Sequence, residues 1–389
     1  MKLLNRITAS QLFLIIASAY IIGFFAHALY LKKTVYGDGV YYYSWLRSVV
    51  IDHDVRFTNE YAHLGGGQPK TALGTVGNKY SIGPAILWAP GYIAAHDLLR
   101  GDGYAFPYQL IVGIVSVLST LFGLVLLWNL LKKYFSGTVA IATTATIAGA
   151  SNLLFYGSID AVNSHALTFF TATVYISLLL AKKKHWFATG IFLGLLGLIR
   201  TQDVLYAVLL IPVLGKSYFV RSVRNVFIGF FIIFLPQLVA WQLLYGKFWM
   251  SPYLTGSEGF NFWHPQIIGV LLSIRSGLFL WTPVTALGVA GFFTGKVKRI
   301  PIRFWMFAVF ILELYTVASW STWWQGASYS GRMFVSSLPI FAFGLASVFS
   351  RLSSFTWNQA YFFLTITGPL TIINGVSIIY FLLSLPGRP

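Results

Sequence analysis

The chain has 389 residues, of which 57% are hydrophobic and 10% are charged, and its formal net charge is +17. Apolar runs of about 17–25 residues recur along it, which is the length that crosses a bilayer core. The composition therefore excludes a soluble protein and predicts an all-α polytopic membrane protein. The absence of Cys excludes disulfides, Cys-ligated metals and thiol nucleophiles.

The positive charge does not indicate nucleic-acid binding. Lys and Arg are spread over short loops between apolar runs, whereas a nucleic-acid interface gathers them on one soluble face. Basic loops orient membrane helices and attract anionic lipids. We therefore expect contacts with membrane lipids and none with nucleic acid.

The first span is predicted at Ser10–Tyr30, with the basic N-terminus in the cytoplasm. A long outer loop over 31–107 follows it. The later apolar runs lie near 108–131, 137–156, 166–181, 186–199, 204–215, 225–245, 278–294, 302–320, 333–349 and 358–383. Together they predict about eleven spans in one membrane domain over 1–389.

The charged residues support this alternation. Basic clusters without any Asp or Glu fall on the cytoplasmic side, at Lys132–Lys133, Lys182–Lys184, 216–224, Lys296–Arg299 and Arg351. The carboxylates fall on the outer side, except Glu313, which lies within a span and is expected to pair with a buried Arg or Tyr. We expect a plasma (inner) membrane protein whose site faces the periplasm or the cell exterior.

Two surface helices are predicted in the first outer loop. Counting Ile82–Leu99 as a span would place Lys132 and Lys133 outside, so we interpret it as an amphipathic helix on the outer membrane surface. Tyr41–Ile51 is predicted to form a similar short helix, with a flexible Gly-rich loop over 65–77 between the two.

Asp38 is the principal candidate for catalysis. It lies between Gly37 and Gly39 just after the first span, where the backbone can approach a substrate closely. A carboxylate partly shielded from water can act as a general base on an alcohol. The structural alternative is a helix cap for a helix that begins near Val40.

Four cations in the outer segments are candidates for binding a phosphate, because Arg and Lys stabilise anions at such an interface. They are Lys79, Arg200, Arg275 and Arg332. The alternative is that each is an interfacial side chain that extends toward water.

Another set of residues is predicted to contact an acceptor or a sugar, and comprises Tyr41, Tyr42, Asp160, His165 and Trp324. The alternatives stay open. Asn163 or Ser164 can start a helix with His165 in its first turn. The aromatic residues also fit a membrane-interface belt.

These features resemble the GT-C superfamily of integral-membrane glycosyltransferases, which includes protein O-mannosyltransferases and the aminoarabinose transferases of lipid A. The resemblance rests on the first span, the large outer loop that opens with an acidic motif, and the short paired spans. The motifs that resemble a bacterial branch are Gly37–Tyr43, Asn78–Pro84, Arg200–Asp203, Gly277–Pro283 and Trp323–Arg332.

The resemblance implies a GT-C bundle and an inverting transfer of a sugar from a polyprenyl-phosphate donor to a glycan, lipid or protein acceptor. It implies that Asp38 deprotonates the acceptor. Many members have two adjacent acidic residues, whereas Gly39 follows Asp38 here, so Asp54 and Glu60 remain alternative bases.

We expect no metal and no cofactor, because the cations named above can neutralise a monophosphate leaving group. Other functions stay open, namely a transporter or flippase of lipid-linked saccharides, or a polysaccharide polymerase or ligase. A flippase favours charged residues at mid-membrane and internal repeats, of which the sequence has little.

Overall fold

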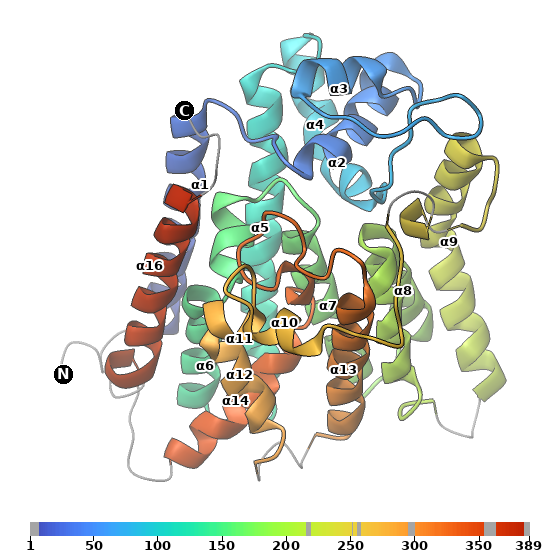
Figure 1. The fold of residues 1–389 in the computed structure, drawn as a ribbon. Helices are drawn as coiled ribbons and strands as arrows, with labels where there is room; N and C mark the ends of the chain where they lie inside the picture. Colours follow the sequence, from blue (N-terminus) through green and yellow to red (C-terminus); the bar gives the residue numbers. More distant parts are fainter. Residues whose placement is uncertain are drawn as a thin grey trace.

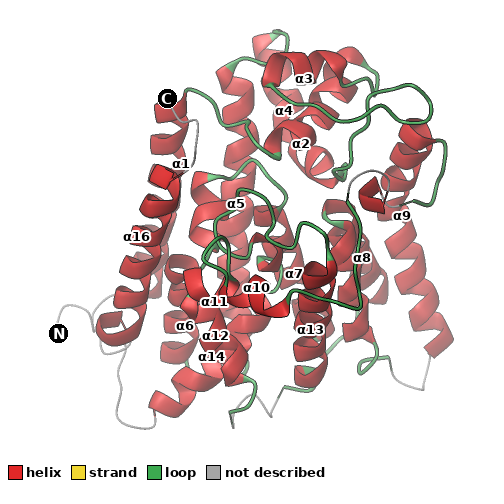
Figure 2. Ribbon diagram, in the orientation of Figure 1, coloured by secondary structure: helices red, strands yellow, loops and turns green. Residues whose placement is uncertain are grey.

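The computed structural model describes residues 8–214, 219–250, 252–254, 258–294, 300–353 and 363–384. The described residues form helices, turns and loops, with two isolated β-bridges and no longer strand (Figure 2). The predicted all-α class is confirmed. The α-helices are α1 Ala9–Leu31, α2 Gly39–Arg47, α3 Thr58–Leu64, α4 Gly83–Leu99, α5 Phe106–Leu131, α6 Gly137–Ala150, α7 His165–Leu179, α8 Trp186–Ile199, α9 Phe219–Tyr245, α10 Ile267–Leu272, α11 Leu278–Trp281, α12 Pro283–Gly291, α13 Arg303–Ser319, α14 Leu338–Leu352 and α16 Gly368–Ser384.

Four described helices are long and apolar enough to cross a membrane. They are Ala9–Leu31, Phe106–Leu131, Phe219–Tyr245 and Phe363–Ser384, the last joining a π-helical turn (η9, Phe363–Thr367) to α16. The long helices α1, α5, α9 and α16 run along the bundle in Figure 1. They match the first, second, seventh and last of the predicted spans, except that residues 358–362 lie outside the described part.

The other predicted spans are shorter helices. Over 278–294 the chain forms α11 and then α12, because Pro283 has no N–H to continue a helix and instead starts the second one. Over 204–215 it forms a 3₁₀ helix, η4, at Thr201–Leu210, which is longer per residue than an α-helix. The apolar runs in the sequence predicted neither the break at Pro283 nor the 3₁₀ helix.

The segment predicted as the first outer loop, residues 31–107, contains three α-helices where two were predicted. The segment Tyr41–Ile51 forms α2 and a π-helical turn (η2, Ser48–Asp52), and α4 fits the second predicted helix. The additional helix is α3. Figure 1 shows α2, α3 and α4 packed together at one end of the bundle.

Aromatic side chains of this outer group, α2–α4, are buried in a core that they share with residues of α5, α7, α8 and α9 and that is distinct from the larger core of the bundle. Trp45, Phe57, Trp88, Tyr92 and Tyr108 are all at most 1% exposed and belong to it. Each such side chain removes about 150–250 Å² from water, so this core fixes the outer group firmly. The group therefore holds the start of α2, where Asp38 lies, in one position.

Candidate functional site

A cavity of about 400 Å³ lies where the outer group of helices meets the bundle. Its wall is built from segments far apart in the sequence, including the start of α2, the start of α7, the start of η4 and the loop before α14. Of the predicted site residues, the wall includes Asp38, Tyr42, Lys79, His165, Arg200 and Arg332. Tyr41, Asp54, Glu60, Asp160, Arg275 and Trp324 do not line it.

The Gly-Asp-Gly motif shapes the backbone around Asp38. Gly37 has a positive φ of 52°, which favours glycine. Gly39 packs so closely that a Cβ there would lie 2.4 Å from the carbonyl oxygen of Val162. The two glycines thus let the chain turn and bring Asp38 against the loop before α7.

The carboxylate of Asp38 points to other side chains and does not cap its own helix. Asp38 is the N-cap residue of α2, but its side chain makes no capping hydrogen bond. Its Oδ1 accepts a hydrogen bond from the Tyr80 hydroxyl at 2.8 Å, and its Oδ2 lies 2.7 Å from Nη1 of Arg332. The capping alternative is therefore wrong for this residue.

Tyr80 acts as a donor to Asp38. Burial, and then the negative charge of Asp38, raise the pKa of Tyr80 above its ordinary value, so its hydroxyl keeps its proton. Sequence reasoning included Tyr80 in a motif but gave it no role. The sequence indicated a role for Tyr80 only through its position next to Lys79, a predicted phosphate-binding residue.

Arg200 lies at the end of α8, where the chain turns into η4. The residue is 8% exposed, and its Nη1 donates to Nδ1 of His165 at 2.6 Å. Its Nη2 contacts the sulfur of Met333. Among the described residues, Arg200 forms no ion pair within 4.0 Å. The cavity wall thus holds a nearly buried guanidinium whose closest partners are uncharged.

The neighbours of His165 decide its protonation state. Because a guanidinium has no acceptor, the contact with Arg200 requires that Nδ1 of His165 carries no proton. The backbone N–H of His165 donates to Asn163 at 2.8 Å. Ser164 is the N-cap residue of α7 and its side chain makes no capping hydrogen bond, so Asn163, one residue earlier, is the residue whose side chain accepts from the first helical N–H. His165 is in the first turn, as the helix-start interpretation predicted, and it also lines the cavity.

Lys79 pairs with Glu258, and both side chains are about one quarter exposed. Glu258 also lines the cavity, together with Tyr253 and Phe260 from the same segment. The sequence placed Glu258 on the outer side but gave it no role. Nothing in the local sequence could show that it meets Lys79.

Asp160 lies beside this cluster without lining the cavity. Burial, and then the negative charge of Asp38, raise its pKa to about 7, while Arg332 acts in the opposite direction. Asp160 is thus near enough to Asp38 and Arg332 for their charges to act on it, but it does not line the cavity that those two residues share.

Arg275 lies outside the cavity. Its side chain is exposed, and its guanidinium stacks over the ring of Trp324 at 5.0 Å. Tyr41 also points elsewhere, because its ring stacks on Tyr80 with 4.7 Å between centroids and its hydroxyl donates to Gly67. None of these three residues lines the cavity.

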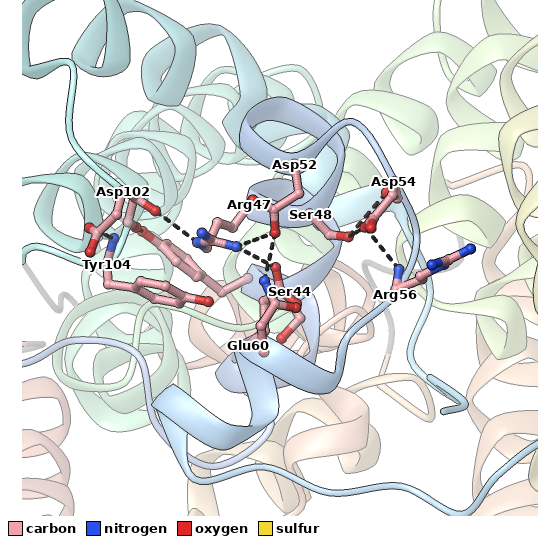
Figure 3. Close-up of polar contacts among 12 residues, drawn as sticks. Ser44, Arg47, Ser48, Asp52, Asp54, Arg56, Glu60, Asp102 and Tyr104 are labelled. Atoms are coloured by element: carbon pink, nitrogen blue, oxygen red, sulfur yellow. Dashed lines mark hydrogen bonds and ion pairs between the residues drawn. The ribbon is translucent and has the colours of Figure 1, made fainter. Parts of the chain in front are cut away.

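The alternative bases Asp54 and Glu60 belong to two neighbouring sets of polar contacts within the outer group, one around Asp54 and one around Arg47 (Figure 3). Oε1 of Glu60 lies 2.7 Å from Nη1 of Arg47, which also lies 2.5 Å from Oδ2 of Asp52. Asp54 accepts from the Ser48 hydroxyl at 2.7 Å. Glu60 is fully buried, and burial raises its pKa although Arg47 opposes the shift. These contacts hold α2, η2 and α3 together.

Among the described residues, no group of three or more His, Asp or Glu side chains is placed to hold a metal ion. Whether the protein uses a metal stays a prediction. Comparison of the chain with protein-family models and with curated proteins finds no match.

Proposed function

We propose that the protein is a membrane glycosyltransferase of the GT-C type. In this proposal it moves a sugar from a polyprenyl-phosphate donor to an acceptor hydroxyl at the outer membrane face. The observation that carries it is the cavity itself, in which the carboxylate Asp38 and the guanidiniums of Arg200 and Arg332 share one wall. A carboxylate base beside cations suits the transfer of a group from a phosphate.

The membrane arrangement supports an outer site. In the proposed eleven-span bundle, the loops with Lys132 and Lys133 face the cytoplasm and the α2–α4 group faces outward. Nucleotide sugars are cytoplasmic, so an outer site implies a lipid-linked donor. The donor's hydrocarbon tail would lie among apolar helices, and its phosphate would lie at the polar cavity.

Asp38 would act as the base and Arg200 as the first phosphate ligand. The acceptor hydroxyl gives its proton to Asp38, and its oxygen forms a bond to the anomeric carbon of the sugar. The bond from that carbon to the phosphate oxygen breaks, and the electron pair leaves with the polyprenyl phosphate. Arg200, which has no carboxylate partner within 4.0 Å among the described residues, stabilises the growing charge.

The ion pair with Arg332 adds an order to these steps. While Arg332 and Tyr80 contact Oδ2 and Oδ1 of Asp38, both carboxylate oxygens already accept hydrogen bonds and are less available to the acceptor hydroxyl. A donor phosphate that attracts Arg332 would loosen this pair. Donor binding would therefore precede deprotonation of the acceptor.

The test is a transfer assay on the purified protein in lipid nanodiscs. A panel of polyprenyl-phosphate sugars is supplied with membrane-derived acceptors, and release of polyprenyl phosphate is measured. Arg200→Ala should lose both donor binding and turnover. Arg275→Ala is the matched control, because that Arg is exposed and outside the cavity, and it should retain activity.

Equal activity of Arg200→Ala and the wild type would count against the proposed site. Movement of a lipid-linked saccharide across proteoliposomes, with no transfer in any assay, would replace the transferase with a flippase.

A further inference from the structure

Two carboxyl groups meet in the buried part of the bundle, next to the cavity wall. Asp203 in η4 is 0% exposed and Glu313 in α13 is 1% exposed. The hydroxyl oxygen of Ser336 lies 3.3 Å from Oδ1 of Asp203 and 3.3 Å from Oε1 of Glu313. Ser337 donates to the second oxygen of Glu313. The expectation that Glu313 pairs with an Arg or Tyr is wrong, because its described hydrogen-bond partners are these two serines.

The single hydroxyl proton of Ser336 indicates that Asp203 and Glu313 are not both ionised. A hydroxyl has one proton to donate, so Ser336 can donate to only one of the two carboxyl groups. The other contact is a hydrogen bond only if that carboxyl group carries a proton and donates it to the Ser336 oxygen. Two ionised carboxylates in a buried site would also repel each other strongly.

The groups around Asp203 and Glu313 also favour one shared proton. Tyr206 donates its hydroxyl proton to the carbonyl oxygen of Ser336 at 2.6 Å, so that proton is not directed to either carboxyl group. Arg200 is the cation closest to Asp203 in the sequence, and although its guanidinium makes no ion pair within 4.0 Å with either carboxyl group, its charge acts on both of them. The N–H of Asp203 also donates to the carbonyl of Arg200 at 2.9 Å, which joins the two residues in one turn.

We propose that Asp203 and Glu313 share one proton through Ser336, and that the remaining negative charge is the counter-charge that positions Arg200. The three groups together then have no net charge. A second negative charge would draw the guanidinium away from the cavity and repel an anion there. This inference concerns the charge state of the bundle, so its test needs no substrate and is separate from the transferase proposal.

The first test uses amide variants, which keep the size of each carboxyl group. Thermal unfolding in detergent is compared for the wild type, Asp203→Asn, Glu313→Gln and the double variant, with Asp97→Asn as the exposed control. Each single variant retains one negative charge and should unfold near the wild-type temperature. The double variant leaves Arg200 without a counter-charge and should unfold at a lower temperature than either single variant.

Other patterns would overturn the proposal. A double variant as stable as both singles would mean that the native pair is uncharged. Single variants that are each more stable than the wild type would mean that both carboxyl groups are ionised.

The second test starts from the wild-type protein, whose spectrum does not depend on the folding of any variant. Infrared spectra at pH 7.5 should contain the carbonyl band of a protonated carboxylic acid, at a pH where Asp160, with a pKa of about 7, is mostly ionised. The band of the pair should be lost in each folded single variant, because the one carboxyl group left then carries the negative charge. Its absence from the wild type would refute the shared proton. A band that keeps its full intensity in both single variants would belong to another residue, such as the buried Glu60, and would refute the shared proton as well.

Discussion

Asp38 and Arg332 form an ion pair with 2.7 Å between Oδ2 and Nη1, although one residue opens the first outer loop and the other precedes α14. Both side chains are partly exposed to the cavity, at 26% and 16%. The pair is therefore within reach of a ligand, and an anion can compete with Asp38 for the guanidinium. The pair thus combines two proposed roles, in which Arg332 binds the donor phosphate and Asp38 accepts the proton of the acceptor.

Asp38→Asn should separate them experimentally. The amide keeps the size of the side chain but is no base, so turnover should fall by about 10²–10⁴-fold. Arg332 loses its anionic partner, so affinity for farnesyl phosphate, used as a short polyprenyl monophosphate, should stay equal or increase. Binding is measured by titration calorimetry and turnover by release of polyprenyl phosphate. A parallel loss of affinity would show that Asp38 maintains the shape of the cavity and is not specifically a base.

Gly39→Ala should destabilise the outer group of helices. Its Cβ would lie 2.4 Å from the carbonyl oxygen of Val162, and a backbone atom cannot move aside as a flexible side chain can. Overpacking of this kind costs about 1–3 kcal/mol. The thermal unfolding temperature should fall, and Asp38 should move away from Arg332. Gly67→Ala, with no atom within 4 Å of the new Cβ, is the control and should unfold like the wild type. Equal stability of both variants would contradict the described packing.

Asp160 should make stability depend on pH. Its pKa in the folded protein is about 7, against an ordinary value of 3.8, so the folded state binds the proton more tightly than the unfolded state. The resulting stabilisation is complete below about pH 4 and is lost as the pH rises to about 7. Between these values, the unfolding temperature of the wild type should fall relative to that of Asp160→Asn. Parallel curves for the two proteins over this interval would show that Asp160 titrates normally.

The sequence predicted the fold class and part of the site, because both depend on local patterns. Apolar length identified α1, α5 and α9, and the position after the first span singled out Asp38. The partners of Asp38 depend on packing between distant segments, so Tyr80 and Arg332 could not be assigned to it. Arg200 and Arg275 look alike in sequence, since each borders an apolar run, and only the fold separates a cavity residue from an exposed one.

Glu60 illustrates the same limit. As one of few acidic residues in the outer loop it was a candidate base, but its position opposite Arg47 gives it a structural role. Glu60→Ala should leave Arg47 without one of its buried partners, and breaking a buried pair costs about 3–5 kcal/mol. Unfolding temperature checks this, with Asp54→Ala as the control because Asp54 is more exposed and accepts from Ser48 and the Arg56 backbone. A stable but inactive Glu60→Ala would instead restore Glu60 as a catalytic candidate.

The predicted sidedness can be tested with single cysteines, because the chain has no Cys of its own. Leu98 is 85% exposed near the end of α4, and Lys133 is exposed just after α5. If α4 stays on the outer surface and α5 crosses the membrane, the two positions lie on opposite sides. An impermeant thiol reagent added to intact cells should label Leu98→Cys and leave Lys133→Cys unlabelled, whereas both should react after the membrane is permeabilised. Labelling of Lys133→Cys in intact cells would place the basic loop outside. The α2–α4 group and its cavity would then face the cytoplasm, where nucleotide sugars are present, and the argument for a lipid-linked donor would fail.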